Sequence, residues 1–139
     1  MKTPEELDQM GQAKWQKGLC HIFADALHGY LEKGEFAAIW VDEGFKHVYV
    51  SLDGLAYDSE TKGETEDAMR ERWRLKTGVA ARLSLAKVAA LRDLALYDVV
   101  FGDTWCADLY YGPHYARWLQ EANDTICNDE DFVRLKDSN

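Results

Sequence analysis

The chain has 139 residues, of which 47% are hydrophobic and 12% aromatic, including five tryptophans. This size and composition predict one domain, residues 1–139, with a substantial core, and they exclude a disordered protein. The net charge of −9 argues against direct binding of nucleic acid, because phosphates attract basic surfaces.

The sequence carries no pattern typical of a membrane or exported protein. No apolar run approaches the ~18 residues that a membrane span needs, and the polar, acidic first residues are unlike a secretory signal. Three cysteines are an odd number, which favours reduced thiols over paired disulfides. We therefore expect a cytoplasmic protein, and no sequence pattern indicates a cofactor.

Two helices are expected first in chain order. Thr3 begins a capping pattern that predicts a helix as far as about Lys17. Apolar residues at three- and four-residue steps then predict a helix from about Leu19 to Glu32. Gly34 is a typical end for the second helix.

Three strands are expected next, within about residues 36–58. Their predicted spans are Phe36–Val41, Phe45–Leu52 and Leu55–Asp58. Between the second and third strands, Asp53-Gly54 is a hairpin turn signal. Consecutive strands joined by short turns predict an antiparallel sheet.

The second half is expected to be mainly helical. After a loop at Ser59–Gly63, helices are predicted at about Glu64–Leu75, Ser84–Tyr97 and Pro113–Ala122, and residues 128–139 are expected to be polar with a frayed end. The resulting fold class is α+β. It has a small three-stranded antiparallel sheet packed by N-terminal and C-terminal helices.

Three residues in the first half have the order that a thiol enzyme needs. Cys20 lies in the first turn of the second predicted helix, where the helix dipole lowers the pKa of a thiol. A neighbouring imidazole would form an ion pair with the thiolate, and a carboxylate would orient that imidazole. His47 and Asp58, on successive strands, suit these two roles.

The hairpin turn decides whether the imidazole and the carboxylate can meet. With a two-residue turn, Val50 faces Tyr57, and His47 becomes a diagonal neighbour of Asp58 on one face of the sheet. A slip of one residue would separate the two side chains. Because the opposite face looks more like the core, a working triad also requires helices on both faces.

The same segments resemble a known family. The run Gly18–Leu27 (GLCHIFADAL), followed by His47–Val50 (HVYV) and Tyr57-Asp58, resembles the compact papain-like domains of bacterial toxins and phage proteins. Those domains carry a Cys-x-x-Phe-Ala-x-Ala-Leu helix, a His-Val strand and a following Asp. The resemblance covers about residues 12–60.

The resemblance implies a papain-like core topology and a thiol hydrolase or acyl-transferase acting on an amide bond, or an inactive relative. It makes Cys20 the nucleophile, His47 the base and Asp58 the orienting acid. Papain-like proteases place an oxyanion-hole glutamine six residues before the cysteine, a position that Lys14 holds here. The nearby Gln16 is out of register. The residue pattern alone also fits an inert core, where a cysteine is a small hydrophobic side chain.

Charge is distributed unevenly along the chain. Residues 93–139 hold ten acids and three bases, whereas residues 68–92 hold seven bases and one acid. The two segments can neutralise each other across the fold. Alternatively, the acidic segment can steer a basic partner toward the protein.

Aromatic residues among these acids form a candidate partner-binding surface, although aromatics at this density can equally fill a core. Trp and Tyr dominate the energetics of protein interfaces. The candidate residues are Asp103, Trp105, Asp108, Tyr110, Glu121 and Asp124. The size and net charge of the chain alone favour a second possible function. This would be a small phage anti-defence inhibitor, similar to some anti-CRISPR proteins, that occupies a basic, nucleic-acid-binding surface of another protein. An α+β interaction domain is the third alternative.

The remaining metal-binding residue types give a weak pattern. Cys106, His114 and Cys127 have irregular spacing and lack a fourth ligand, so no metal site is predicted. His21 and His28 lie seven residues apart on the second predicted helix, and we expect them at the surface.

Overall fold

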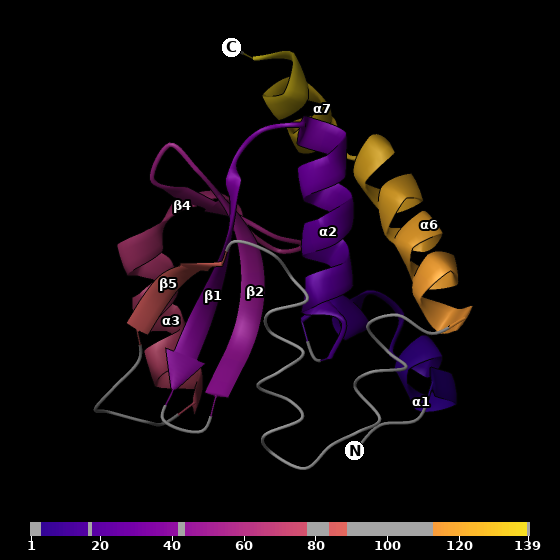
Figure 1. The fold of residues 1–139 in the computed structure, drawn as a ribbon, viewed down its shortest axis with the longest axis horizontal. Helices are drawn as coiled ribbons and strands as arrows, with labels where there is room; N and C mark the ends of the chain where they lie inside the picture. The colour runs from indigo at the N-terminus through magenta and orange to yellow at the C-terminus, as the bar shows by residue number, and fades with distance from the viewer. Residues whose placement is uncertain (1–3, 17, 42–43, 78–83, 89–112, 139) are drawn as a thin grey trace.

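A five-stranded antiparallel sheet forms the centre of the α+β fold (Figure 1). The computed structural model describes residues 4–16, 18–41, 44–77, 84–88 and 113–138. In chain order the strands are β1 (Glu35–Val41), β2 (Gly44–Leu52), β3 (Leu55–Tyr57), β4 (Lys62–Thr65) and β5 (Ser84–Val88). Their order across the sheet is β4-β3-β2-β1-β5, so β2, which carries His47, is the central strand.

Helices precede and follow the strands. They are α1 (Pro4–Gln9), the short 3-10 helix η1 (Gly11–Trp15), α2 (Cys20–Leu31), α3 (Glu66–Thr77), α6 (Pro113–Cys127) and α7 (Glu130–Asp137). No helix among the described residues is long and apolar enough to cross a membrane.

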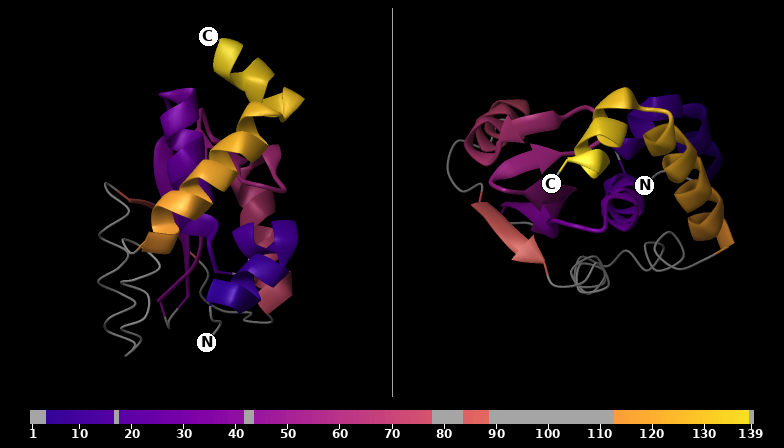
Figure 2. Two further views of the ribbon diagram at one scale, coloured as in Figure 1. Left: turned by 90° about the vertical axis from the view of Figure 1, so that its right-hand side faces the viewer. Right: turned by 90° about the horizontal axis from the view of Figure 1, so that it is seen from above.

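The helices cover both faces of the sheet. On one face, Val48 and Val50 share a core with the buried apolar side of α2, and α6 packs on the outer side of α2 (Figure 2). On the other face, Tyr49 belongs to a second cluster that includes Met69 and Trp73 of α3. The alternation of side chains along β2 therefore divides its residues between the two layers.

The three expected strands are present, but the expectation of a three-stranded sheet was wrong. The segment after β3 forms β4 where a loop and the start of a helix were expected. Ser84–Val88 is a strand where a helix was expected to begin at Ser84. This segment pairs with β1, so that Ala38 lies opposite Ala86. The gain from pairing with an exposed sheet edge overrode the local helix signal. The rest of that expected helix lies outside the described residues.

Both terminal regions also differ from expectation. The first predicted helix is divided into α1 and η1 at Gly11, whose φ of +59° cannot continue a right-handed helix. No helix was expected among residues 128–139, but Glu130–Asp137 forms α7. The Asp129 side chain caps α7 by accepting hydrogen bonds from the backbone N–H groups of Asp131 and Phe132. The Phe132 side chain is buried, and this burial fixes α7 against the core.

The hairpin between β2 and β3 has the expected register. Val50 lies opposite Tyr57, and Leu52 lies opposite Leu55. The two turn residues, Asp53 and Gly54, have φ of +53° and +80°, as a two-residue type I′ turn requires.

Replacing Gly54 by Val should lower the free energy of unfolding by about 1–2 kcal/mol, because a side chain with a Cβ is strained at this positive φ. No heavy atom lies within 4 Å of the position of the new Cβ, so the loss measures backbone strain rather than a clash. Urea denaturation gives the value.

Gly29 supplies the matched control. It lies within α2, its Cβ position is also open, and its φ is not positive. Gly29→Ala should leave stability unchanged or raise it by up to ~1 kcal/mol. Equal effects of the two substitutions would contradict the turn assignment.

Candidate active site

A buried hydrogen bond joins two of the three expected catalytic residues. Nε2 of His47 lies 2.6 Å from Oδ2 of Asp58. The exposed fractions of the two residues are 0% and 2%, so the contact is shielded from water. Charged hydrogen bonds of this kind are short and strong.

The end of the β2–β3 ladder explains how Asp58 reaches His47. The last paired residues are Val50 and Tyr57, and the chain turns immediately afterwards. The backbone N–H of Asp58 donates to the carbonyl of Thr61 at 2.9 Å. The N–H of Glu60 donates to Oδ1 of Asp58, also at 2.9 Å. The turn thus holds one carboxylate oxygen and leaves the other for His47.

Cys20 occupies the first position of α2. Backbone N–H groups at a helix start have no partner within the helix. The residue before it, Leu19, makes no side-chain cap hydrogen bond. The positive end of the α2 dipole therefore lies at the thiol without a competing cap. Cys20 is 6% exposed.

The surroundings of Cys20 favour its thiolate. Burial alone would raise the pKa of the thiol. Hydrogen bonding to His21 and His47, together with the charge of His47, lowers the pKa of Cys20 from 9.0 to about 6. A cysteine packed only by apolar groups would have a raised pKa, so these surroundings differ from those of an inert core thiol.

His47 shows the complementary shift. Burial alone would lower the pKa of its ring. The hydrogen bond that Nε2 of His47 donates to Asp58, together with the interaction with Cys20, raises the pKa of His47 from 6.5 to about 9. At Asp58 burial would raise the pKa of the carboxyl, but the hydrogen bond and charge of His47, together with hydrogen bonds from Glu60 and Thr61, lower it from 3.8.

The two ring nitrogens of His47 have separate partners. Because Nε2 is bonded to Asp58, Nδ1 is the nitrogen that remains for the thiol of Cys20. Nδ1 is buried and makes no hydrogen bond of regular geometry with the described residues. Its interaction with the thiol is therefore looser than the bond to Asp58, as is common in sites without substrate.

Between pH of about 6 and about 9, these shifts favour a thiolate beside an imidazolium. The lowered pKa of Cys20 contributes stability that is complete above the unfolded value of 9.0 and is lost as pH falls through about 6. The raised pKa of His47 contributes stability that is complete below 6.5 and is lost as pH rises through about 9. The ion pair is thus limited to this window.

An aromatic ring from the α3 layer lies over the imidazole. The Trp73 ring of α3 stacks on His47, with centroids 4.7 Å apart and planes 22° apart. Trp73 is 6% exposed. No local sequence pattern points to Trp73, because it is distant from His47 along the chain.

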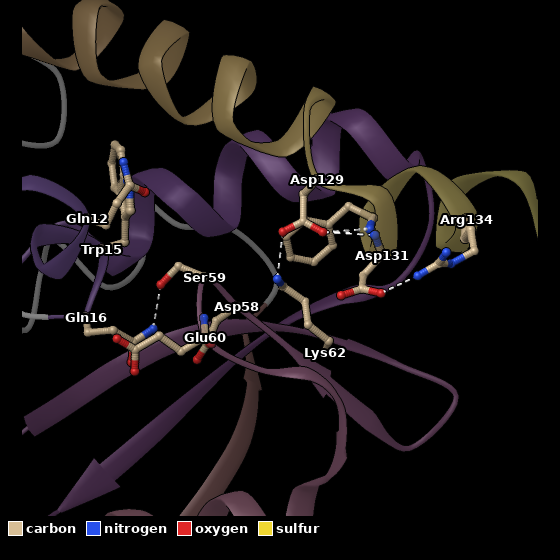
Figure 3. A network of polar contacts seen from close by, with 11 residues as sticks. Gln12, Trp15, Gln16, Asp58, Ser59, Glu60, Lys62, Asp129, Asp131 and Arg134 are labelled. Atoms are coloured by element: carbon tan, nitrogen blue, oxygen red, sulfur yellow. Dashed lines mark hydrogen bonds and ion pairs between the residues drawn. The ribbon is translucent and has the colours of Figure 1, made fainter.

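The polar residues before Cys20 are also placed by long-range contacts. Lys14, which the papain-like resemblance would align with an oxyanion-hole glutamine, is buried and pairs with Glu121 of α6. Gln16 is buried, and its side-chain amide donates to Oγ of Ser59 at 2.8 Å (Figure 3). Ser59 follows Asp58 directly. Lys14 therefore ties the segment to α6, whereas Gln16 ties it to the turn that holds Asp58.

The expectation that His21 lies at the surface was wrong. His21 is buried, with an exposed fraction of 2%, and it interacts with Cys20. Its position directly after the cysteine was the available signal. His28 is partly buried, and its Nε2 lies 3.2 Å from the carbonyl oxygen of Gly34.

The structure describes only part of the alternative partner-binding surface. Four of its residues, Asp103, Trp105, Asp108 and Tyr110, lie outside the described residues. Glu121 pairs with Lys14, so its carboxylate has a structural contact. Asp124 is exposed and accepts a hydrogen bond from Gln120 at 2.9 Å.

Among the described residues, two acids of the segment 93–139 form ion pairs with lysines that are distant along the chain. Glu121 pairs with Lys14, and Asp129 pairs with Lys62 at 2.7 Å. The arginines of α3 use local acids instead, in the pairs Arg70–Asp67, Arg72–Glu64 and Arg74–Glu71. Both lysines lie outside the basic segment 68–92, whereas Asp131 pairs locally with Arg134.

Residues considered as metal ligands are not assembled into a metal site in the described part of the chain. Within the described ranges, no three His, Cys, Asp or Glu side chains are placed to hold an ion. His114 and Cys127 lie near opposite ends of α6, and Cys106 is outside the described residues.

A hollow of about 300 Å³ lies between β3 and α7, lined by residues that include Tyr57, Lys62, Phe132 and Arg134. Cys20, His47 and Asp58 do not line it. The hollow is therefore separate from the candidate active site.

Comparison with known proteins adds no relative. No family model, curated protein or solved structure matches the chain.

The ultraviolet absorbance of the thiolate should reveal the state of Cys20. The difference between wild type and Cys20→Ser should titrate with a midpoint near pH 6. Asp58→Asn should move the midpoint upward, since loss of the carboxylate lowers the pKa of His47 and weakens the ion pair. Cys127→Ser should leave the titration unchanged. A midpoint at or above the ordinary thiol value of ~8.5 would contradict the thiolate assignment.

Glu121→Gln should lower the free energy of unfolding by about 1–2 kcal/mol, because it leaves the buried ammonium of Lys14 without its charged partner. The partial exposure of Glu121 limits the loss. Asp124→Asn, on the same helix, should change stability by less than about 0.5 kcal/mol. Thermal or urea denaturation tests both, and equal losses would argue against a structural role for Glu121.

Proposed function

We propose that the protein is a papain-like thiol enzyme, a hydrolase or acyl-transferase acting on an amide bond. The observation that carries this proposal is the buried bond between His47 and Asp58 beside a thiol of lowered pKa. A proton acceptor, an orienting carboxylate and an activated sulfur are the three components that nucleophilic catalysis by cysteine requires.

The proposed reaction begins with attack on an amide carbonyl. The thiolate of Cys20 forms a carbon–sulfur bond, and an electron pair of the carbonyl moves to its oxygen. Nδ1 of His47 then gives its proton to the amide nitrogen, the carbon–nitrogen bond breaks, and an amine leaves. The remaining thioester joins Cys20 to the acyl group.

The second half of the reaction releases the acyl group. Nδ1 of His47, now neutral, removes a proton from water or from an acceptor amine. That nucleophile attacks the thioester, and the thiolate leaves. Asp58 keeps Nε2 protonated throughout, so Nδ1 remains the nitrogen that exchanges protons. Water as acceptor gives a hydrolase, and an amine gives a transferase.

The start of α2 supports stabilisation of the negative oxygen. The backbone N–H of Cys20 lies at the helix start, and Leu19 supplies no side-chain cap, so the helix dipole favours an oxyanion there. Gln16 is the nearest glutamine along the chain. Its amide is held by Ser59, and we assign it as the candidate for a second donor.

Acylation by p-nitrophenyl acetate tests the proposal without knowledge of the natural substrate. Mass spectrometry of the intact protein and of its peptides should place the acetyl group on Cys20. Cys20→Ser should abolish rapid labelling, and His47→Gln should slow it by about 10²–10⁴-fold, the usual contribution of general acid–base catalysis.

Two further measurements complete the design. Cys127→Ser should label like wild type, because Cys127 is exposed on α6 and has no role in the proposed reaction. Release of acetate, compared with transfer to an added amine, separates hydrolase from transferase. Equal labelling of Cys20 and Cys127, or full reactivity in folded His47→Gln, would refute the enzyme proposal.

A further inference from the structure

The contacts of the His47 ring lie in two directions. In the plane of the ring, Nε2 meets Asp58 and Nδ1 is left for Cys20. Above the plane, the ring of Trp73 stacks at 4.7 Å with an angle of 22°. The in-plane contacts restrain where the nitrogens point, and the stacked ring restrains the tilt of the imidazole.

Trp73 also suits the charge that His47 carries in the ion pair. The face of an indole attracts a cation, and the attraction is stronger where water is excluded. His47 is completely buried, and Trp73 is 6% exposed. An aliphatic side chain of similar size would fill the space, but it would not offer this negative face.

The position of Trp73 connects the two layers of the fold. It lies on α3 in a cluster with Tyr49 of β2 and Met69, whereas Cys20 begins α2, which packs against the opposite face. The imidazole therefore interacts with the carboxylate after β3 and with the sulfur at the start of α2, whereas its aromatic contact comes from α3.

We propose that Trp73 is a positioning residue for the catalytic imidazole, which fixes the tilt of His47 and favours its protonated form through ring stacking. This inference rests on the proposed function for its catalytic meaning. The stacking itself is a property of the folded protein. The titratable groups that shift the pKa of His47 are Cys20 from α2 and Asp58 after β3. The Tyr49 ring of β2 also lies nearly parallel to the imidazole, with centroids 6.5 Å apart, and its hydroxyl donates to Glu66. From α3 the contact is Trp73, which does not titrate.

The test measures the His47 ring directly. In Trp73→Leu, NMR titration of His47 should show a pKa lower by about one unit than in wild type, because the cation–π contribution is lost. In the acetylation assay, the pKa that defines the alkaline limb of the pH–rate profile should fall by the same amount. The rate at neutral pH should fall about tenfold.

Trp73→Phe retains an aromatic face, so it should keep most of the wild-type pKa of His47 and most of the wild-type acetylation rate. Trp118→Leu is the matched control, since Trp118 is a buried tryptophan in the other core cluster. It should lower stability but leave the His47 titration unchanged. Circular dichroism confirms that each variant is folded before its titration is interpreted.

The outcomes separate this inference from the proposed function. An unchanged His47 titration and pH profile in folded Trp73→Leu would overturn the positioning role, even if Cys20 is acetylated normally. An equal shift in Trp118→Leu would overturn it too, because general loosening would then explain the effect. If Cys20 is unreactive but Trp73→Leu still shifts the His47 pKa, the stacking role stands and the enzyme proposal fails.

Discussion

The hydrogen bond between His47 and Asp58 is the interaction on which the rest of the site depends. Two buried groups that can both carry charge would be costly apart, because burial disfavours each charged form. Together, at 2.6 Å, they make a protonated imidazole stable in the interior. That positive charge in turn lowers the pKa of Cys20. The thiol is therefore activated through a chain of charges that begins at a turn after β3.

Layers on both sides of the sheet supply the contacts that surround this bond. α2 brings the sulfur to one side of the central strand, and α3 brings an indole to the ring of His47. The hairpin between β2 and β3 sets the register, and the end of its ladder frees Asp58 to turn toward the imidazole. Each element contributes one contact, so the geometry belongs to the fold as a whole.

The sequence predicted the parts of this arrangement that local patterns encode. The period of α2 and the Asp53-Gly54 turn were sufficient to predict that Cys20 begins a helix and that His47 and Asp58 meet on one face of the sheet. Local patterns could not show that Ser84–Val88 would pair with β1 as a strand, because that outcome depends on a distant sheet edge. They also gave no indication of Trp73, whose role depends on packing between layers. Asp129 is a residue type that typically caps helices, but α7 was not predicted because the surrounding residues are mostly polar.

The contacts of α6 and α7 with the region around α2 bear on the order in which the chain can complete its packing during synthesis. Cys20, His47 and Asp58 leave the ribosome well before residues 113–138, yet Lys14 needs Glu121 of α6 to neutralise its buried charge. Phe132 of α7 packs against Phe23 of α2, with ring centroids 6.1 Å apart. We therefore expect the packing around α2 to be complete only after α6 and α7 have docked. A fragment that ends before residue 113 would contain Cys20, His47 and Asp58 but would lack the contacts through which Glu121 and Phe132 support the region around α2.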